Sequence, residues 1–301
     1  MPNAADVFGD YKIVSSYNAA DLSEEIAKIL SKKFSAVELT EFPDGEFKVR
    51  LSEDYRNSKI LLIHRLYPDA SRSVGALLFM LHKLAGNGNI IDILIPYLAF
   101  SRQDKEFQNG EVASALALLE LLSKNNIGRL TFDIHSAGIA SGSGMEVISI
   151  PIAALLVKYI NNTVKPNSPI AVAPDKGAEQ RAAEASKELG CSYICFEKET
   201  DRQRGAIFTK APNADFMGTD AIIIGDIIST GGIIANVSSI LKRVWANTVY
   251  AACIHYLSLA GTEKGLSGSG ADRIFATDTV RSKFSKVGIA KEFVNFFTKD
   301  S

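Results

Sequence analysis

The chain has 301 residues, and its 33 lysines and arginines nearly balance its 34 aspartates and glutamates, for a net charge of −1 at pH 7. This length favours two domains over one. Balanced charge supplies no overall attraction for nucleic acid or an anionic membrane, and the longest apolar runs are too short to span a bilayer. Because the first residues lack a signal-peptide pattern, we expect a cytoplasmic protein that binds neither nucleic acid nor membrane.

Strand-like and helix-like segments alternate along the first half of the chain. A capping-box-like pair, Asp21 and Glu24, opens a predicted helix that runs to about Lys33. Two further helices are predicted at Val74–Ala85 and Val112–Lys124. The predicted strands are Tyr11–Ser15, Ala36–Thr40, Phe47–Leu51, Lys59–His64, Ile90–Ile95 and Arg129–Phe132. Such alternation is typical of a parallel, doubly wound sheet.

A second round of the same alternation begins after Pro151. The predicted strands are Ile170–Ala173, Ser192–Phe196, Ala221–Ile224, Val249–His255 and Arg273–Ala276. The predicted helices are Ala178–Leu189, Ile233–Trp245 and Ile289–Phe297. We therefore expect two tandem α/β domains, at 1–150 and 151–288, followed by a terminal helix at 289–301 that could pack back on the first domain.

The stretch from Gly225 to Gly232 carries the strongest chemical signal. It joins a buried strand to a helix, and its adjacent glycines let successive N–H groups turn toward an anion at the positive helix end. Ser229 and Thr230 add hydroxyl donors, while Asp226 suits sugar hydroxyls or a metal ion. The pattern predicts a sugar-phosphate site, and a plain strand-to-helix turn with a capping hydroxyl is the alternative.

Two polar segments of the first half suit a nucleotide. Phe42, Asp44 and Glu46 gather at a predicted hairpin turn, where they could stack on a purine and accept from its amine, although a turn alone also explains them. Arg102, Gln103 and Lys105 follow a buried strand at the sheet edge where ligands collect, and they offer donors and charge to phosphates. A solvated charged loop is the alternative for the second segment.

Two other strand ends carry carboxylates. In extended geometry Asp133 and His135 project to the same side and could share one cation, while a hydrogen-bonded histidine at a strand end is the alternative. Asp175 stands before Gly177 at the start of a helix, where it could touch a sugar hydroxyl or a metal, or simply cap the helix. The charged stretch from Phe196 to Gly205 reads as a hairpin after a strand.

These segments together resemble the ribose-phosphate pyrophosphokinase family, also called PRPP synthetases. The matching segments occur in family order, at 42–46, 101–105, 133–135, 173–182 and 225–232. The resemblance implies two domains of type I phosphoribosyltransferase-like fold. It also implies transfer of the β,γ-diphosphoryl group of ATP to the 1-hydroxyl of ribose 5-phosphate, giving PRPP and AMP, with Mg²⁺ as cofactor.

The resemblance further implies roles for particular residues. The implied ATP-binding residues are Phe42, Asp44, Glu46, Arg102, Gln103, Asp104, Lys105 and His135. Those implied for ribose 5-phosphate are Asp175, Asp226, Ser229, Thr230, Gly231 and Gly232. The implied metal ligands are Asp133, His135 and Asp175, and the implied catalytic residues are Lys198 and Arg202. Since the family presents its hairpin to a neighbouring subunit, we expect a homo-oligomer, at least a dimer.

The chain departs from the family pattern at three positions. Gly225 stands where a first acid is usual, Ile233 where a second threonine follows the glycines, and Thr200 where an arginine follows the catalytic lysine. These departures leave open a catalytically lapsed, PRPP-synthetase-like regulatory subunit. A PRPP-consuming phosphoribosyltransferase is the other alternative, but it would not need the two nucleotide segments of the first half.

Overall fold

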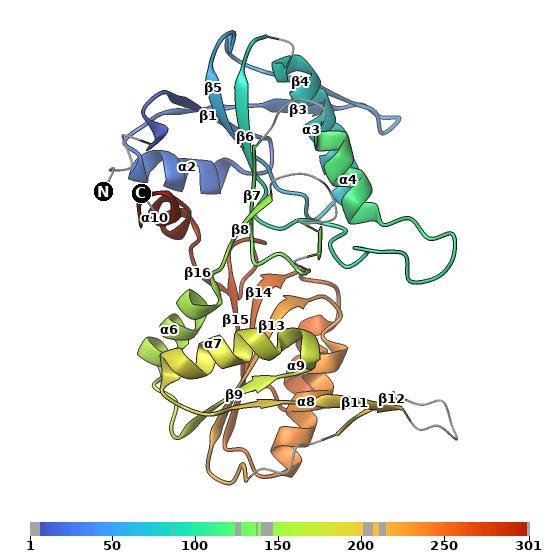
Figure 1. The fold of residues 1–301 in the computed structure, drawn as a ribbon, viewed down its shortest axis with the longest axis vertical. Coiled ribbons are helices and arrows are strands. Elements are labelled where there is room, and N and C mark those ends of the chain that lie inside the picture. Colours follow the sequence, from blue (N-terminus) through green and yellow to red (C-terminus); the bar gives the residue numbers. More distant parts are fainter. Residues whose placement is uncertain are drawn as a thin grey trace. The chain divides into compact units, whose positions relative to one another are not determined.

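The computed structural model describes residues 7–85, 87–123, 128–136, 138–139, 147–200, 207–210 and 215–299. The chain separates into two compact units, Met1–Ile150 with Ile289–Ser301, and Pro151–Gly288. Each unit has a six-stranded parallel sheet flanked by helices (Figure 1). No helix in the described part of the chain is long and apolar enough to cross a bilayer.

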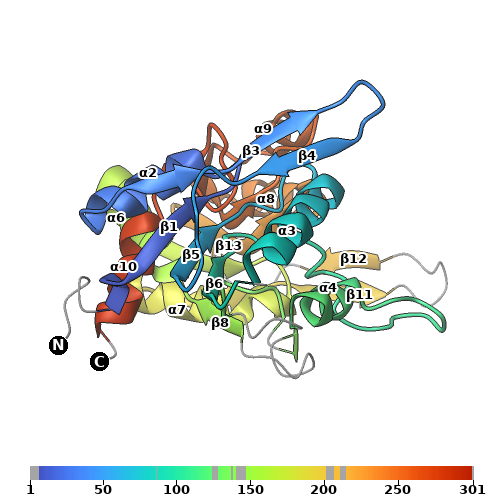
Figure 2. The ribbon, with the colours of Figure 1, turned by 90° about the horizontal axis from the view of Figure 1, so that it is seen from above.

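The first unit is built on the sheet β2-β1-β5-β6-β7-β8, in which every neighbouring pair is parallel. Its strands are β1 Tyr11–Ser15, β2 Phe34–Ala36, β5 Lys59–Ile63, β6 Ile90–Leu94, β7 Gly128–Phe132 and β8 Val147–Ile150. Helices α2 and α10 cover one face and α3 and α4 the other (Figures 1 and 2). Their bounds are α2 Ala20–Ile29, α3 Ala70–Ala85, α4 Ser114–Ser123 and α10 Ala290–Lys299.

The second unit repeats this plan with the parallel sheet β10-β9-β13-β14-β15-β16. Its strands are β9 Pro169–Ala173, β10 Tyr193–Cys195, β13 Asp220–Ile228, β14 Thr248–Tyr256, β15 Arg273–Thr277 and β16 Ser285–Val287. Helices α6 and α7 pair on one face, and α8 and α9 pair on the other (Figure 1). Their bounds are α6 Ala153–Val164, α7 Glu179–Leu189, α8 Gly232–Arg243 and α9 Thr262–Gly268.

Two antiparallel hairpins extend from the sheets. In the first unit β3 (Glu38–Glu41) pairs with β4 (Phe47–Arg50), and in the second β11 (Glu197–Thr200) pairs with β12 (Ile207–Lys210). Among the described strands, only these four pair antiparallel. The predicted fold class, two tandem doubly wound α/β sheets, is confirmed.

Strand β13 shows why the apolar runs of the sequence form the sheet interiors. Ile222, Ile223 and Ile224 are all 0% exposed, although consecutive side chains of a strand point to opposite faces. Both faces of the strand are therefore covered by helices, as in parallel sheets generally. The strand order reverses between β9 and β13, and between β1 and β5 in the first unit. Such switch points, at the carboxyl ends of the strands, are where open α/β sheets bind ligands.

Several predicted boundaries were wrong. The first helix begins after Ala19 without a side-chain cap, because Asp21 forms an ion pair with the buried Arg65 instead. The helix ends at Ile29, since the chain turns with a left-handed Ser31. The predicted strand Ala36–Thr40 is divided between β2 and β3. Strands β8 and β16 and helices α6 and α9 were not predicted at all.

Candidate active site

The sugar-phosphate loop is shorter than the sequence predicted. The loop was expected to begin at Gly225, but β13 continues to Ile228, because Ile227 and Ile228 pair with His255 and Tyr256 of the equally long β14. The connection to α8 therefore consists of Ser229, Thr230 and Gly231 only. It leaves the carboxyl end of β13 at the switch point of the second sheet.

Three consecutive backbone N–H groups lie at this connection and the start of α8. Within the described ranges, no residue accepts a hydrogen bond from the backbone N–H of Thr230, Gly231 or Gly232. These groups precede or open α8, whose first N–H groups have no partners inside the helix. Unpaired donors beside the positive end of a helix form a site for an anion such as phosphate.

Gly231 is required by both conformation and space. Its φ is +76°, in the left-handed region that favours glycine. A Cβ atom here would lie 3.1 Å from the Thr262 methyl and 3.2 Å from Leu266. Gly232 differs, since the nearest atom to a Cβ there would be the Thr230 hydroxyl at 3.9 Å. The first glycine is therefore fixed by the protein, while the second leaves room above the helix end.

Asp226 and Gly225 lie in the strand before the loop. Asp226 is half-buried, and its Oδ1 accepts from the backbone N–H of Ile227 at 2.7 Å. A Cβ at Gly225 would make ordinary contact with Ile234 of α8 at 3.9 Å. A side chain at this buried position would thus begin by pointing toward α8.

Asp175 follows β9, the strand next to β13. It has extended backbone angles and precedes a short 3₁₀ helix, Lys176–Ala178, but its side chain makes no capping bond there. Asp175 therefore occupies the N-cap position, as one interpretation of the sequence had it, but without a side-chain capping bond. Its carboxylate comes close to Gly177, whose Cβ would lie 3.3 Å from Oδ1. The ends of β9 and β13 thus place Asp175 and Asp226 at the same sheet edge.

In the first unit, the predicted nucleotide loop follows β6 and is organised by a residue that was not predicted. One carboxylate oxygen of Glu111 accepts from the Gln103 amide at 3.1 Å and from the backbone N–H groups of Phe107 and Gln108 at 3.1 and 3.2 Å. Within the described ranges, no carboxylate pairs with the Arg102 guanidinium or the Lys105 ammonium. Both cations are exposed and available to an anionic ligand.

The strand geometry assumed for Asp133 and His135 was wrong. Strand β7 ends at Phe132, and Asp133 has a left-handed φ of +39°. The rule that alternate residues share one side of a strand does not apply beyond that point. The backbone is nevertheless fixed, since the Asp133 and Ile134 N–H groups donate to the Ile150 carbonyl and the Ser149 hydroxyl. No three carboxylate, imidazole or thiol groups lie together as a metal site in the described chain.

Phe42, Asp44 and Glu46 lie together at the exposed tip of the β3–β4 hairpin. Asp44 Oδ1 accepts from the Glu46 N–H at 3.0 Å, so this acid stabilises the turn. The hairpin is attached to α3 by Arg72, which donates to both oxygens of Glu41 at 2.6 and 2.7 Å. The tip is therefore held in a defined orientation relative to its own unit.

The predicted catalytic residues are described only in part. Lys198 lies within β11, opposite Thr209 of β12, rather than in a loop. Its side chain lies outside the described residues, as does Arg202.

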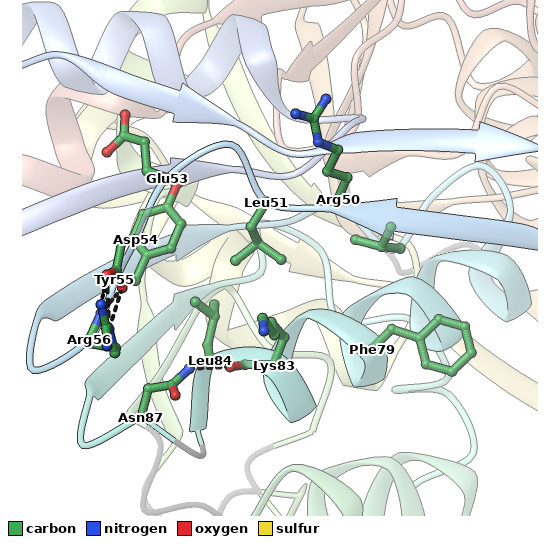
Figure 3. A pocket seen from close by; sticks show the side chains of 11 residues that line it. Arg50, Leu51, Glu53, Asp54, Tyr55, Arg56, Phe79, Lys83, Leu84 and Asn87 are labelled. Atoms are coloured by element: carbon green, nitrogen blue, oxygen red, sulfur yellow. Dashed lines mark hydrogen bonds and ion pairs between the residues drawn. The ribbon is translucent and has the colours of Figure 1, made fainter.

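A groove of about 640 Å³ lies between β4 and α3 but contains none of the predicted site residues. Figure 3 shows Leu51 pointing across it toward Leu84, while Arg50 points to the opposite side. Two of its cations already have partners, since Arg50 pairs with Glu38 at 3.2 Å and Arg56 with Asp54 at 2.6 Å. The groove is therefore a poor site for a triphosphate.

The switch point of the first sheet is filled by the chain itself. After β1, the Asn18 amide donates to the Arg65 carbonyl at 2.7 Å, and after β5, His64 Nε2 lies 2.9 Å from the Ser73 carbonyl. His64 is 0% exposed, and burial lowers its pKa to about 4. The equivalent point of the second sheet instead presents N–H groups from which no described residue accepts a hydrogen bond. The two sheets thus share a topology, but their switch points differ in the donors that the described residues leave available.

Two doubly wound units, one with backbone donors at its switch point and one with an exposed basic loop, define an α/β protein whose chemistry suits phosphorylated ligands. Comparisons with known proteins agree. A family model described as the N-terminal domain of ribose phosphate pyrophosphokinase matches residues 11–125. The fold matches that of phosphoribosylpyrophosphate synthetase from Mycobacterium smegmatis, with a TM-score of 0.83 and 23% identity over 96% of this chain and 98% of that chain.

Curated relatives of the same name align with this chain along most of their length. Ribose-phosphate pyrophosphokinase of Sulfolobus acidocaldarius is 34% identical over 89% of this chain and 92% of its own. The Thermoplasma volcanium protein of that name is 31% identical over 95% of this chain and 98% of its own. The chain belongs to the ribose-phosphate pyrophosphokinase family.

Proposed function

We propose that the protein transfers the β,γ-diphosphoryl group of ATP to the 1-hydroxyl of ribose 5-phosphate, giving PRPP and AMP. The observation that supports this most strongly is the similarity along the chain, which aligns over 89% of its length with a relative named ribose-phosphate pyrophosphokinase. The phosphate cradle of the second unit and the exposed cations of the first unit suit the two anionic substrates.

The two units divide the substrates between them. The N–H groups of Thr230, Gly231 and Gly232 hold the 5-phosphate, and Asp226 accepts from ribose hydroxyls. Arg102 and Lys105 hold the triphosphate, because both are exposed cations without a carboxylate partner among the described residues. Each unit is thus a domain with its own substrate.

The reaction is an in-line displacement at the β-phosphorus. The sugar 1-oxygen forms a bond to this phosphorus, the bond to the α,β-bridging oxygen breaks, and AMP leaves with that oxygen. The hydroxyl proton passes to a phosphate oxygen, so no covalent intermediate with the protein is needed. Catalysis is positioning and charge neutralisation by Arg102, Lys105 and Lys198, and each well-aimed donor contributes about 2.7–4 kcal/mol.

The acids present suit Mg²⁺. This ion prefers oxygen ligands and is usually bound by one or two carboxylates together with substrate phosphates, rather than by an all-protein cage. Asp133 and Asp175 each offer a carboxylate after a strand end, and His135 follows Asp133 by two residues in the sequence. When bound, the ion would neutralise charge on the phosphates.

The chain acts as a homo-oligomer, at least a dimer, in the cytoplasm. The hairpin tip with Phe42, Asp44 and Glu46 is exposed, as a surface presented to the nucleotide of a neighbouring subunit must be.

The direct test is AMP release from Mg-ATP with ribose 5-phosphate, with ribose, and with no sugar. We expect AMP only with ribose 5-phosphate, since the 5-phosphate anchors the acceptor. AMP release that is independent of the sugar would indicate hydrolysis. A protein that is inactive yet binds both substrates would support the lapsed regulatory subunit, and PRPP consumption with a free base would support the transferase.

A further inference from the structure

One side chain attaches the phosphate loop to the neighbouring helix. Thr262, the first residue of α9, is 3% exposed, and its hydroxyl donates to the Ser229 carbonyl at 2.7 Å. Its methyl group lies in the space that a side chain at Gly231 would need, at 3.1 Å. Leu266, one turn later in α9 and 0% exposed, closes the same space. The loop therefore rests on α9 through one hydrogen bond and one close packing contact.

This bond fixes the direction of the peptide group between Ser229 and Thr230. In a planar trans peptide, the C=O of one residue and the N–H of the next point in opposite directions. Since the Ser229 carbonyl is held toward α9, the Thr230 N–H must point away from α9. No described residue accepts a hydrogen bond from that N–H. The Thr262 hydroxyl thus determines where the first donor of the cradle is aimed.

The same geometry shows what loss of the bond would permit. When a peptide group rotates by half a turn, its N–H and its C=O exchange the directions in which they point. The Ser229 carbonyl oxygen would then face the anion that the Thr230 N–H should bind, and a donor would be replaced by a repelling dipole. Thr262 lies 33 residues from Ser229 in the sequence, so no local pattern around the loop indicates this dependence.

We infer that Thr262 is a positioning residue for the sugar phosphate. Its hydroxyl holds the peptide between Ser229 and Thr230 with the N–H directed at the 5-phosphate, and its methyl group keeps Gly231 in the left-handed conformation that starts α8. This inference rests on the proposed function, because it names a residue that serves the ribose 5-phosphate site.

Three variants separate positioning from folding. Thr262→Val keeps the branched shape and the contact with Gly231 but removes the hydroxyl, whereas Thr262→Ser keeps the hydroxyl. Thr277→Val is the control, because Thr277 is also buried and donates to a backbone carbonyl, that of Ile254, at the same 2.7 Å, and its hydroxyl also contacts Thr279. Thr277→Val should therefore lose at least as much stability in thermal unfolding as Thr262→Val.

The readouts are the KM for ribose 5-phosphate, the KM for Mg-ATP, and binding of ribose 5-phosphate by calorimetry. We expect Thr262→Val to weaken ribose 5-phosphate binding and raise its KM roughly 10-fold, the scale of one hydrogen bond to a charged group. The KM for Mg-ATP should stay within about 2-fold, as expected for a site in the other domain. Thr262→Ser and Thr277→Val should keep the wild-type KM for ribose 5-phosphate.

The outcomes distinguish this inference from the proposed function. Equal ribose 5-phosphate binding by the wild type and Thr262→Val would overturn the inference alone. A parallel loss in Thr277→Val would overturn it too, because general destabilisation would then explain the effect. A wild type that binds ribose 5-phosphate but releases no AMP would contradict the proposed function, while weaker binding by Thr262→Val would still support the positioning role. A wild type that binds no ribose 5-phosphate would overturn both.

Discussion

Acid should destabilise the first unit through one buried histidine. His64 is 0% exposed at the carboxyl end of β5, and its Nε2 must donate to the Ser73 carbonyl, which can only accept. A second proton would therefore go to Nδ1, which is buried and has no hydrogen-bond partner in the described chain. Burial without an acceptor disfavours the charged ring and lowers its pKa from 6.5 to about 4.

The size and sign of the effect follow from linkage. Above pH 6.5 His64 is neutral in both the folded and the unfolded chain, and its contribution does not change. Between pH 6.5 and about 4 the unfolded chain binds the proton first, so stability falls as the pH falls. A difference of about 2.5 pH units at ~1.4 kcal/mol each gives about 3.5 kcal/mol, and below about pH 4 the loss is complete.

The substitution His64→Gln tests this account. The glutamine amide can still donate to the Ser73 carbonyl but does not titrate, so this loss of stability between pH 6.5 and 4 should disappear. Hydrogen–deuterium exchange of peptides from β5 and α3 would measure the free energy of opening in this unit alone. The control is His82→Gln, at an exposed position of α3, which should leave the pH dependence of this opening free energy unchanged. An unchanged acid slope in His64→Gln would refute the reasoning.

Four further predictions concern the proposed substrate sites. Gly231→Ala should destabilise the protein and raise the KM for ribose 5-phosphate at least about 10-fold, because of the left-handed φ and close contacts of Gly231, while Gly232→Ala should leave thermal stability near wild type. Equal loss of thermal stability in both variants would contradict the geometry. Asp226→Ala should raise the KM for ribose 5-phosphate and leave that for ATP unchanged, and the reverse pattern in steady-state kinetics would count against it. Lys198→Ala should lower kcat by roughly 10²–10³ with little change in KM, and wild-type kcat would remove Lys198 from catalysis. Analytical ultracentrifugation should show at least a dimer, and a fully active monomer would exclude the role proposed for the Phe42–Glu46 tip across subunits.

The central strands could be predicted from the sequence because burial on both faces produces continuous apolar runs. Tyr11–Ser15 matches β1 at both ends. Two edge strands, β8 and β16, were missed, since they have only four and three residues and lie at the ends of their sheets. The edge strand β10 was predicted, at Ser192–Phe196. A strand with one neighbour needs less apolar sequence, so its pattern is weak.

The loop of the proposed sugar-phosphate site was predictable because its pattern is local in sequence. Its small residues predicted a cradle, which stays a prediction, and no described residue accepts from the N–H groups of Thr230 to Gly232. The start of the loop was not predictable, because it depends on how far β14 extends beside β13. Thr262 was not predictable either, because its contact with Ser229 exists only in the folded chain. The prediction that Asp133 and His135 share one side of a strand failed for a related reason, because the left-handed φ of Asp133 is not apparent from an Asp-Ile-His pattern.

The most direct test of the account is to follow the reaction by ³¹P NMR with ATP that carries ¹⁸O in its α,β-bridge. We predict AMP that retains the label and, in equal amount, a diphosphate ester of ribose 5-phosphate, because the bond between the β-phosphorus and the bridging oxygen breaks. ADP, orthophosphate, or free pyrophosphate formed with unlabelled AMP would contradict the transfer of one intact diphosphoryl group to the sugar.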